Sequence, residues 1–283
     1  MALTARRMTP KSSTSKKIIT SQRSSFHFYL KEIWAYRGLL WTLTYRDLRI
    51  RYAQTYLGFI WLILQPLTTL LIFSLVFGIA IKVDTGGIPY PVFAFAGLFA
   101  WNYFSGLVSQ GGESILNAQG LITKVYFPKI ILPLSKAIVV SIDFFINFLL
   151  MVIILIWYQY APPSNVWFLP VWLLTLIIAS LGVSIGLSAL SIQFRDFQPI
   201  AKFSLQVGFY LTPIAYPSQL IPTLYHPLYY CNPMAGIVEG FRWSIIGGQV
   251  SPYIYISVGV TLILFITSLW YFRRVEQTMA DIV

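Results

Sequence analysis

GLITKVYFPKIILPL, residues 120–134, lies between two apolar segments that are each long enough to cross a bilayer. It carries two lysines, an aromatic pair and two prolines. Such a segment is too polar to lie in lipid and too apolar to be a solvated linker. We therefore predict a short helix that lies against the membrane on the cytoplasmic side and is offered to a soluble partner.

The composition is that of a membrane protein. Apolar residues make up 57% of the 283 residues and charged residues only 10%, whereas a soluble domain carries about a quarter charged residues. The net charge of +11 does not indicate nucleic-acid binding, because the Lys and Arg residues flank apolar segments. The single cysteine, Cys231, excludes an intrachain disulfide, and two histidines do not make a usual zinc site.

Six apolar segments predict an all-α integral membrane protein with a six-helix transmembrane domain over residues 57–283. Residues 65–66, Gln-Pro, predict a kink in the first of them. The fifth segment is short and ends among prolines. The segments are residues 59–81, 91–109, 137–158, 166–194, 200–216 and 253–272.

The positive charges predict the orientation. An even number of spans puts both termini on one side, and a cytoplasmic amino terminus places 18 of the 20 Lys and Arg residues inside. Only Lys82 and Arg242 then fall outside. We expect both termini in the cytoplasm.

The chain before the first span divides into three parts. Residues 1–25 are basic, serine-rich and without acidic residues, which predicts a disordered cytoplasmic tail. Residues 26–56 combine an amphipathic interface helix over 26–41 with a basic lead-in. A core helix of a small soluble domain is the alternative, but the sequence offers no second soluble element. The predicted apolar stripe contains Phe26, Tyr29, Leu30, Ile33, Trp34, Leu40 and Trp41.

The basic lead-in carries Arg46, Asp47, Arg49 and Arg51. On a helix Asp47 and Arg51 are four residues apart and are expected to pair, which leaves Arg46 and Arg49 for lipid phosphate. Membrane anchoring is the simpler interpretation. The sharper hypothesis is that Arg46, Arg49 and Arg51 meet the pyrophosphate of a lipid-linked substrate, since arginine suits bidentate phosphate contacts.

Residues 218–250 are predicted to lie outside, yet they are apolar and rich in proline and glycine. Ile237, Phe241 and Ile245 recur at a four-residue spacing, and Arg242 follows Phe241. One or two short helices that re-enter the outer leaflet as a gate are expected, with a plain external loop as the alternative. Ile237, Phe241 and Arg242 are the gate candidates.

Aromatic residues reach 17%, and most are expected in interfacial belts. Some fall in the middle of the second span, where they could line a passage and stack on sugar rings. These channel candidates are Phe99, Trp101, Tyr103 and Phe104.

The sequence has no G-x-x-x-x-G-K-[ST] loop, and no cluster of acids, histidines or cysteine resembles a catalytic or metal site. We therefore expect a transport protein that is not an enzyme and binds no cofactor. Asp143, one turn before Asn147, is the acid inside a predicted span. A hydrogen-bonded structural role is favoured for it over a proton site.

Five stretches together resemble the permease subunits of ABC type-2 exporters for lipid-linked polysaccharides such as O antigen, capsule and teichoic acid. They are YRDLRIRYAQTYLGFIWLILQPL (45–67), LITKVYFPKIILPLS (121–135), FRDFQPI (194–200), TPIAYP (212–217) and NPMAGIVEGFRW (232–243). They lie in the family's order and extend over most of the chain from residue 26.

The resemblance implies a homodimer in the bacterial inner membrane, with six transmembrane helices in each copy. It also implies two copies of a separate ATP-binding cassette subunit, which would hold ATP and Mg. The coupling helix would fall around residues 121–132, and outer gate helices within 218–250. The residues implied to contact the ATPase are Lys124, Val125, Tyr126, Phe127, Pro128 and Lys129, with Lys31 and Glu32 of the interface helix.

These observations favour export of a lipid-linked polysaccharide. A drug or lipid exporter of the same superfamily, an ion-coupled secondary transporter and a membrane-embedded transferase are the alternatives. The secondary transporter would call for internal repeats that the sequence does not show. On the sequence alone, Phe127→Asp is predicted to abolish ATP-dependent export while leaving the protein in the membrane.

Overall fold

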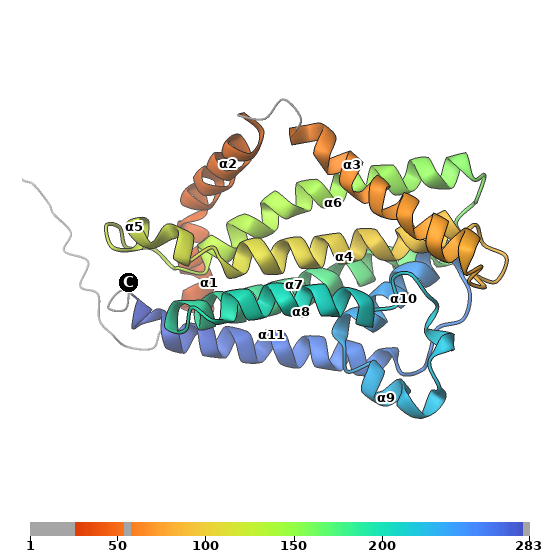
Figure 1. The fold of residues 1–283 in the computed structure, drawn as a ribbon. Coiled ribbons are helices and arrows are strands. Elements are labelled where there is room, and N and C mark those ends of the chain that lie inside the picture. The colour runs from red at the N-terminus through yellow and green to blue at the C-terminus, as the bar shows by residue number, and fades with distance from the viewer. Residues whose placement is uncertain (1–25, 54–57, 280–283) are drawn as a thin grey trace, which may run out of the picture.

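The computed structural model describes residues 26–53 and 58–279, and every regular element within these ranges is a helix (Figure 1). This confirms the all-α class. The predicted tail, residues 1–25, and residues 54–56 of the lead-in lie outside the described residues. The α-helices are α1 (Phe26–Ala35), α2 (Arg37–Ala53), α3 (Gly58–Phe73), α4 (Tyr90–Gly112), α5 (Gln119–Ile122), α6 (Ile131–Trp157), α7 (Leu169–Gln193), α8 (Phe197–Leu211), α9 (His226–Tyr229), α10 (Pro233–Ile246) and α11 (Ile254–Glu276).

Five helical segments of the described chain are long and apolar enough to cross a membrane: Ile60–Ala80, Tyr90–Gly112, Ile131–Trp157, Ser164–Gln193 and Ile254–Glu276. They match five of the six predicted spans. The first of them runs through Pro66 and ends in a π-helical stretch, Ser74–Ala80.

The remaining predicted span, residues 200–216, corresponds to α8, which falls short. Its 15 residues rise only about 22 Å, against a hydrocarbon core of about 30 Å. The helix stops because Thr212 precedes Pro213, and a residue before proline is driven out of the helical region; Thr212 is extended, with φ −88° and ψ 141°. The described residues therefore contain five full-length candidate spans, whereas six were expected.

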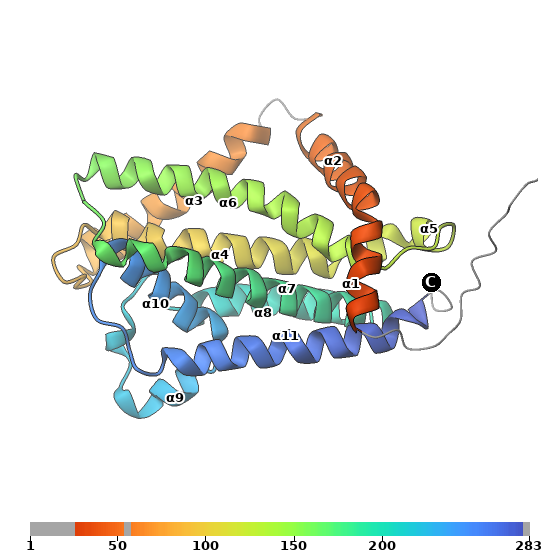
Figure 2. The same ribbon diagram turned by 180° about the vertical axis from the view of Figure 1, so that it is seen from behind.

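Helix α7 lies at the centre of the bundle and packs on α4, α10 and α11, while α6 packs on the other side of α4 (Figures 1 and 2). Helices α1 and α5 lie at one end of the bundle, here called the α5 end. Helices α9 and α10 lie at the opposite end, called the α10 end. Helices α2 and α3 form a V beside α6, so α3 keeps much of its apolar surface exposed.

Small residues bring α7 close to α11. A Cβ atom on Gly182 would lie 2.9 Å from the Cα atom of Phe265, and one on Gly186 would lie 2.6 Å from Ser268 Oγ. Two glycines four residues apart are a common device for close packing of helices in membranes. The α7–α11 contact therefore depends on backbone approaching backbone.

Gly182→Ala is expected to destabilise the protein by about 1–3 kcal/mol, because the added methyl group meets backbone that cannot move aside. The melting temperature of the detergent-purified protein measures the effect. Gly259→Ala on α11 is the matched control, since a Cβ atom there meets nothing within 4 Å. Equal melting temperatures for the two variants would contradict the close packing.

Candidate functional site

A hydrophobic cluster at the α5 end, separate from the main core, joins distant parts of the chain. It gathers side chains from α1, α2, the start of α6, and the ends of α7 and α11, around the connecting segment, residues 113–130. We call this cluster the junction. Its buried members are Tyr29, Leu43, Ile115, Ala118, Ile122, Phe127, Ile130, Ile131, Leu132, Ile185, Ala189, Ile192, Phe272, Val275 and Met279.

The connecting segment contains less helix than predicted. A 3₁₀ turn, Leu116–Ala118, leads into α5, and residues 123–130 form turns and irregular chain before α6 begins at Ile131. The prediction of one helix around 121–132 is therefore wrong. Pro128 explains the gap, since proline restricts the residue before it to extended conformations.

The connecting segment divides into an exposed loop and a buried base. Residues 123–126 are exposed, with Val125 at 50% and Tyr126 at 52%. Phe127, at 2%, and Pro128 are buried against the junction. Of the residues predicted to meet an ATPase, Lys124, Val125 and Tyr126 are thus available, whereas Phe127 is a packing residue.

Glu276, at the end of α11, fixes the base of the connecting segment. The Lys129 backbone N–H donates to Glu276 Oε1 at 2.6 Å, and Lys129 Nζ donates to the Glu276 carbonyl oxygen at 3.0 Å. The Tyr29 hydroxyl donates to Glu276 Oε2 at 2.7 Å. Burial and the neighbouring Glu276 carboxylate raise the pKa of Tyr29 far above its ordinary value, so this hydroxyl stays a donor. Sequence reasoning missed Glu276, because nothing local marks its distant partners.

Helix α1 presents two apolar faces where one stripe was predicted. Tyr29 and Ile33 pack on the junction, whereas Leu30 and Trp34 are exposed. The predicted single helix over 26–41 also breaks at Tyr36, between α1 and α2. The exposed face suits the membrane interface, where Trp is favoured.

The two polar residues of α1 singled out from the sequence lie near the exposed loop. Lys31 is exposed, and Glu32 Oε1 accepts a hydrogen bond from the Tyr126 hydroxyl at 3.4 Å. The interface helix and the connecting segment therefore share one surface.

The acids near α2 pair with cations other than those predicted. Asp47 binds Lys136 Nζ at 2.6 Å and Arg46 at 2.9 Å. Arg51 binds Asp143 at 2.6 Å. The predicted Asp47–Arg51 pair is therefore wrong, because partners on α6 compete successfully with the partner one turn away. Two ion pairs thus hold α2 to α6, and Arg49 is exposed.

The Arg51–Asp143 pair is tested by a double-mutant cycle with Arg51→Gln and Asp143→Asn. Each single variant is expected to lower stability by about 1–3 kcal/mol, since it leaves one charge without this partner. The double variant should lose less than the sum of the two. Melting temperatures of the purified variants measure the cycle, and strict additivity would contradict the pairing.

Arg242 lies buried at the α10 end. Its guanidinium donates to the carbonyl oxygens of Phe93, Ile214 and Tyr216, and lies 3.7 Å from the centre of the Phe93 ring. Glu239, one turn earlier, accepts hydrogen bonds from Ser218 and Tyr230.

The other gate candidates, Ile237 and Phe241, are also buried. In this chain α10 is packed firmly against α4 and α7, and a gating role for these residues stays a prediction.

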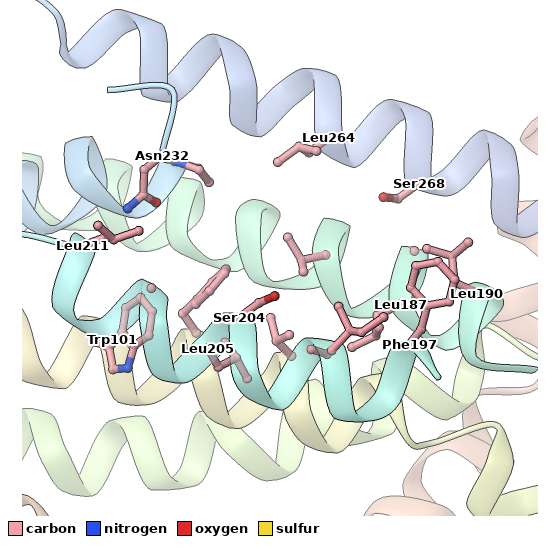
Figure 3. A pocket seen from close by; sticks show the side chains of 18 of the residues that line it. Trp101, Leu187, Leu190, Phe197, Ser204, Leu205, Leu211, Asn232, Leu264 and Ser268 are labelled. Carbon is pink, nitrogen blue, oxygen red and sulfur yellow. The ribbon is translucent and has the colours of Figure 1, made fainter. Parts of the chain in front are cut away.

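The four aromatic channel candidates fall into two pairs. Phe99 and Tyr103 are buried in the core, each against Phe144. Trp101 and Phe104 line a cavity of ≈ 820 Å³ between α8 and helices α4, α7 and α11 (Figure 3). A channel role for any of the four stays a prediction.

The cavity is mainly apolar. Leu187, Leu205 and Leu264 point into it from three helices (Figure 3). Ser204, Asn232 and Ser268 supply polar groups. No charged side chain of the described residues lines it, so it suits a hydrocarbon chain better than a sugar.

The model of the ABC-2 type transporter family matches residues 38–246. The chain is similar to the O-antigen export system permease protein RfbA of Klebsiella pneumoniae, with 30% identity over 247 residues, 86% of this chain and 94% of the relative. It is 31% identical to RfbA of Myxococcus xanthus over 215 residues, 75% and 82% of the two chains. It is 26% identical to the polysialic acid transport protein KpsM of Escherichia coli over 241 residues, 83% and 93% of the two chains. By the extent of the family match and of this similarity, the chain belongs to the ABC-2 type transporter family.

Proposed function

We propose that this chain is the transmembrane permease of an ATP-driven exporter that moves a lipid-linked polysaccharide across the bacterial inner membrane. The relatives named for O-antigen export and polysialic acid transport match it over most of their length. Five apolar helices among the described residues fit a multi-pass membrane protein.

The exposed loop at residues 123–126, set on the junction, is the observation that carries this function. A soluble partner can reach the loop, and the junction connects its base to α1, α7 and α11. The sequence has no P-loop. The work of transport therefore falls to a separate ATP-binding cassette subunit, docked on Lys124, Val125, Tyr126, Lys31 and Glu32.

We infer a homodimer with two such subunits and with both termini in the cytoplasm. The exposed apolar surfaces of α3 and α8 support a second copy, since they need lipid or protein to cover them. Ile60, Trp61 and Leu71 are exposed on α3, and Phe203 and Tyr210 on α8. Helix α8 would count as the sixth membrane helix, with the irregular chain after it lying in the membrane under protein cover.

The basic lead-in would receive the lipid-linked substrate. Arg46 and Arg51 already bind Asp47 and Asp143, so a phosphate group meets exposed Arg49 first. Arg46 and Arg51 would bind the phosphate only by releasing Asp47 and Asp143. This ranks Arg49 above the other two for substrate contact.

The test is a strain that lacks the gene and receives it back with an affinity tag. We expect an ATP-binding cassette protein to co-purify with the tagged chain. Surface polysaccharide, stained on gels of whole cells, should disappear without the gene and return with it. Normal surface polysaccharide in the deletion strain would overturn the cargo assignment. Export by the purified chain reconstituted alone would overturn the ATPase assignment.

A drug or lipid exporter is the second candidate, and the apolar cavity beside α8 favours it. Loss of the gene would then raise sensitivity to apolar drugs and leave surface polysaccharide unchanged. Ion-coupled transport loses its main support, because its candidate ion site, Asp143, binds Arg51.

A further inference from the structure

We infer that α11 connects the connecting segment to the α10 end, with Glu276 and Ser257 as the positioning residues at its two ends. This inference rests on the proposed function, in which a partner ATPase moves the loop at residues 123–126. It deepens that function by naming the element through which the movement reaches the opposite end of the bundle.

At the α5 end, Glu276 binds both elements that a partner would contact. Its carboxylate accepts from the Lys129 backbone N–H and from the Tyr29 hydroxyl. Lys129 Nζ also caps the last carbonyl of α11. The Arg273 guanidinium lies 5.0 Å from the centre of the Tyr29 ring. One turn of α11 therefore contacts α1 and the connecting segment together.

Each of the two Lys129 contacts joins a backbone group to a side chain: the Lys129 N–H donates to the Glu276 carboxylate, and Lys129 Nζ donates to the Glu276 carbonyl oxygen. Only two residues, the buried Phe127 and Pro128, separate Lys129 from the exposed loop. A displacement of the loop toward or away from the bundle therefore has to move the end of α11, or to break these hydrogen bonds.

At the α10 end, Ser257 makes the matching contacts. Its Oγ lies 2.7 Å from the Tyr230 carbonyl oxygen, 3.1 Å from that of Asn232, and accepts from the Gly236 N–H at 3.2 Å. A Cβ atom on Gly236 would lie 2.5 Å from Ser257 Cβ, so the two backbones are in close contact. One buried hydroxyl thus holds the start of α10 and the chain that leads into it.

Helix α11 is one unbroken helix of 23 residues, and Ser257 and Glu276 lie about 28 Å apart along it. It packs along α7, where Gly182 and Gly186 allow close approach. A helix of this kind moves as a unit, because its backbone hydrogen bonds leave no hinge. A displacement of Glu276 is therefore expected to displace Ser257 as well.

The test compares variants in the assembled complex, purified with its own ATPase. Glu276→Ala is expected to lower surface polysaccharide in the complemented deletion strain roughly tenfold, while ATP hydrolysis by the complex stays within about twofold of wild type. Ser257→Ala, at the opposite end of α11, should likewise lower export and leave ATP hydrolysis nearly unchanged. Gln277→Ala, an exposed neighbour of Glu276, is the matched control and should export normally.

Two further variants separate coupling from folding. Tyr29→Phe removes one hydrogen bond and keeps the buried ring, and Glu276→Gln keeps an acceptor for Lys129. Both should assemble, with export between that of wild type and of Glu276→Ala. Hydrogen exchange of peptides over residues 124–131 should be faster in Glu276→Ala, which reports directly on the Lys129 contact.

Each result is decisive. Normal export in both Glu276→Ala and Ser257→Ala would overturn the inference, and so would equal losses of export and ATP hydrolysis in Tyr29→Phe and Ser257→Ala. If Glu276→Ala fails to assemble, the results for Tyr29→Phe and Ser257→Ala decide whether the inference holds. A wild-type chain that brings down no ATPase instead refutes the proposed function.

Discussion

Val125→Asp is expected to reach the membrane in normal amount and to export almost no polysaccharide. Val125 is half exposed on the loop at residues 123–126, so a carboxylate there is hydrated in the free protein. In a docked complex the same carboxylate would lose its water in an apolar contact, which costs about 2 kcal/mol or more. Binding of the ATPase should therefore weaken roughly 30-fold or more.

Co-purification of the ATPase and surface polysaccharide measure this effect. Val125→Thr is the control, because it keeps the shape of the side chain without adding a charge. Wild-type export by Val125→Asp would show that the exposed loop is not where the partner binds.

Phe127→Asp is expected to damage the protein itself. The Phe127 ring is 2% exposed and packs within the junction. Removing a buried phenylalanine side chain costs about 3–5 kcal/mol, and burying a carboxylate in its place adds to that cost. Low abundance in the membrane and a lower melting temperature are therefore expected, in contrast to Val125→Asp.

This reverses the expectation drawn from the sequence, in which Phe127→Asp blocks export but leaves the protein in place. Phe127→Leu keeps an apolar side chain and should restore most of the abundance. A Phe127→Asp protein as abundant and as heat-resistant as wild type would contradict the burial of this ring.

The sequence predicts most of the bundle, because apolar length and the absence of charge are local properties. It overestimates α8, where the apolar run continues past Leu211 but the helix does not. The proline that ends the helix is visible in the sequence. Its effect on the length of the span becomes definite only when the start of the helix, Phe197, is known.

The sequence indicates a surface segment at residues 120–134 but not which of its residues are exposed. The composition of residues 120–134 indicates a surface segment, yet neighbours such as Val125 and Phe127 are equally apolar, and only the packing shows which one faces out. The contacts of Glu276 with Tyr29 and Lys129 span 247 and 147 residues of chain, so no local pattern reports them.

The ion pairs show the same limit. Asp47 and Arg51 have the helical spacing for a pair, and that spacing is worth only about 0.2–0.5 kcal/mol. Lys136 and Asp143 on α6 offer partly buried partners that replace it. A weak local preference thus gives way to tertiary contacts that the sequence does not reveal.

The buried guanidinium of Arg242 restricts how the α10 end can open. Its hydrogen bond to the Phe93 carbonyl oxygen would be lost if α10 separated from α4, and those to Ile214 and Tyr216 if α10 separated from the chain after α8. A buried guanidinium that loses its hydrogen bonds without gaining water costs several kcal/mol. In the proposed transport cycle, residues 219–229, whose Leu220, Leu224 and Leu228 are exposed, are therefore expected to move more easily than the contact between α10 and α4.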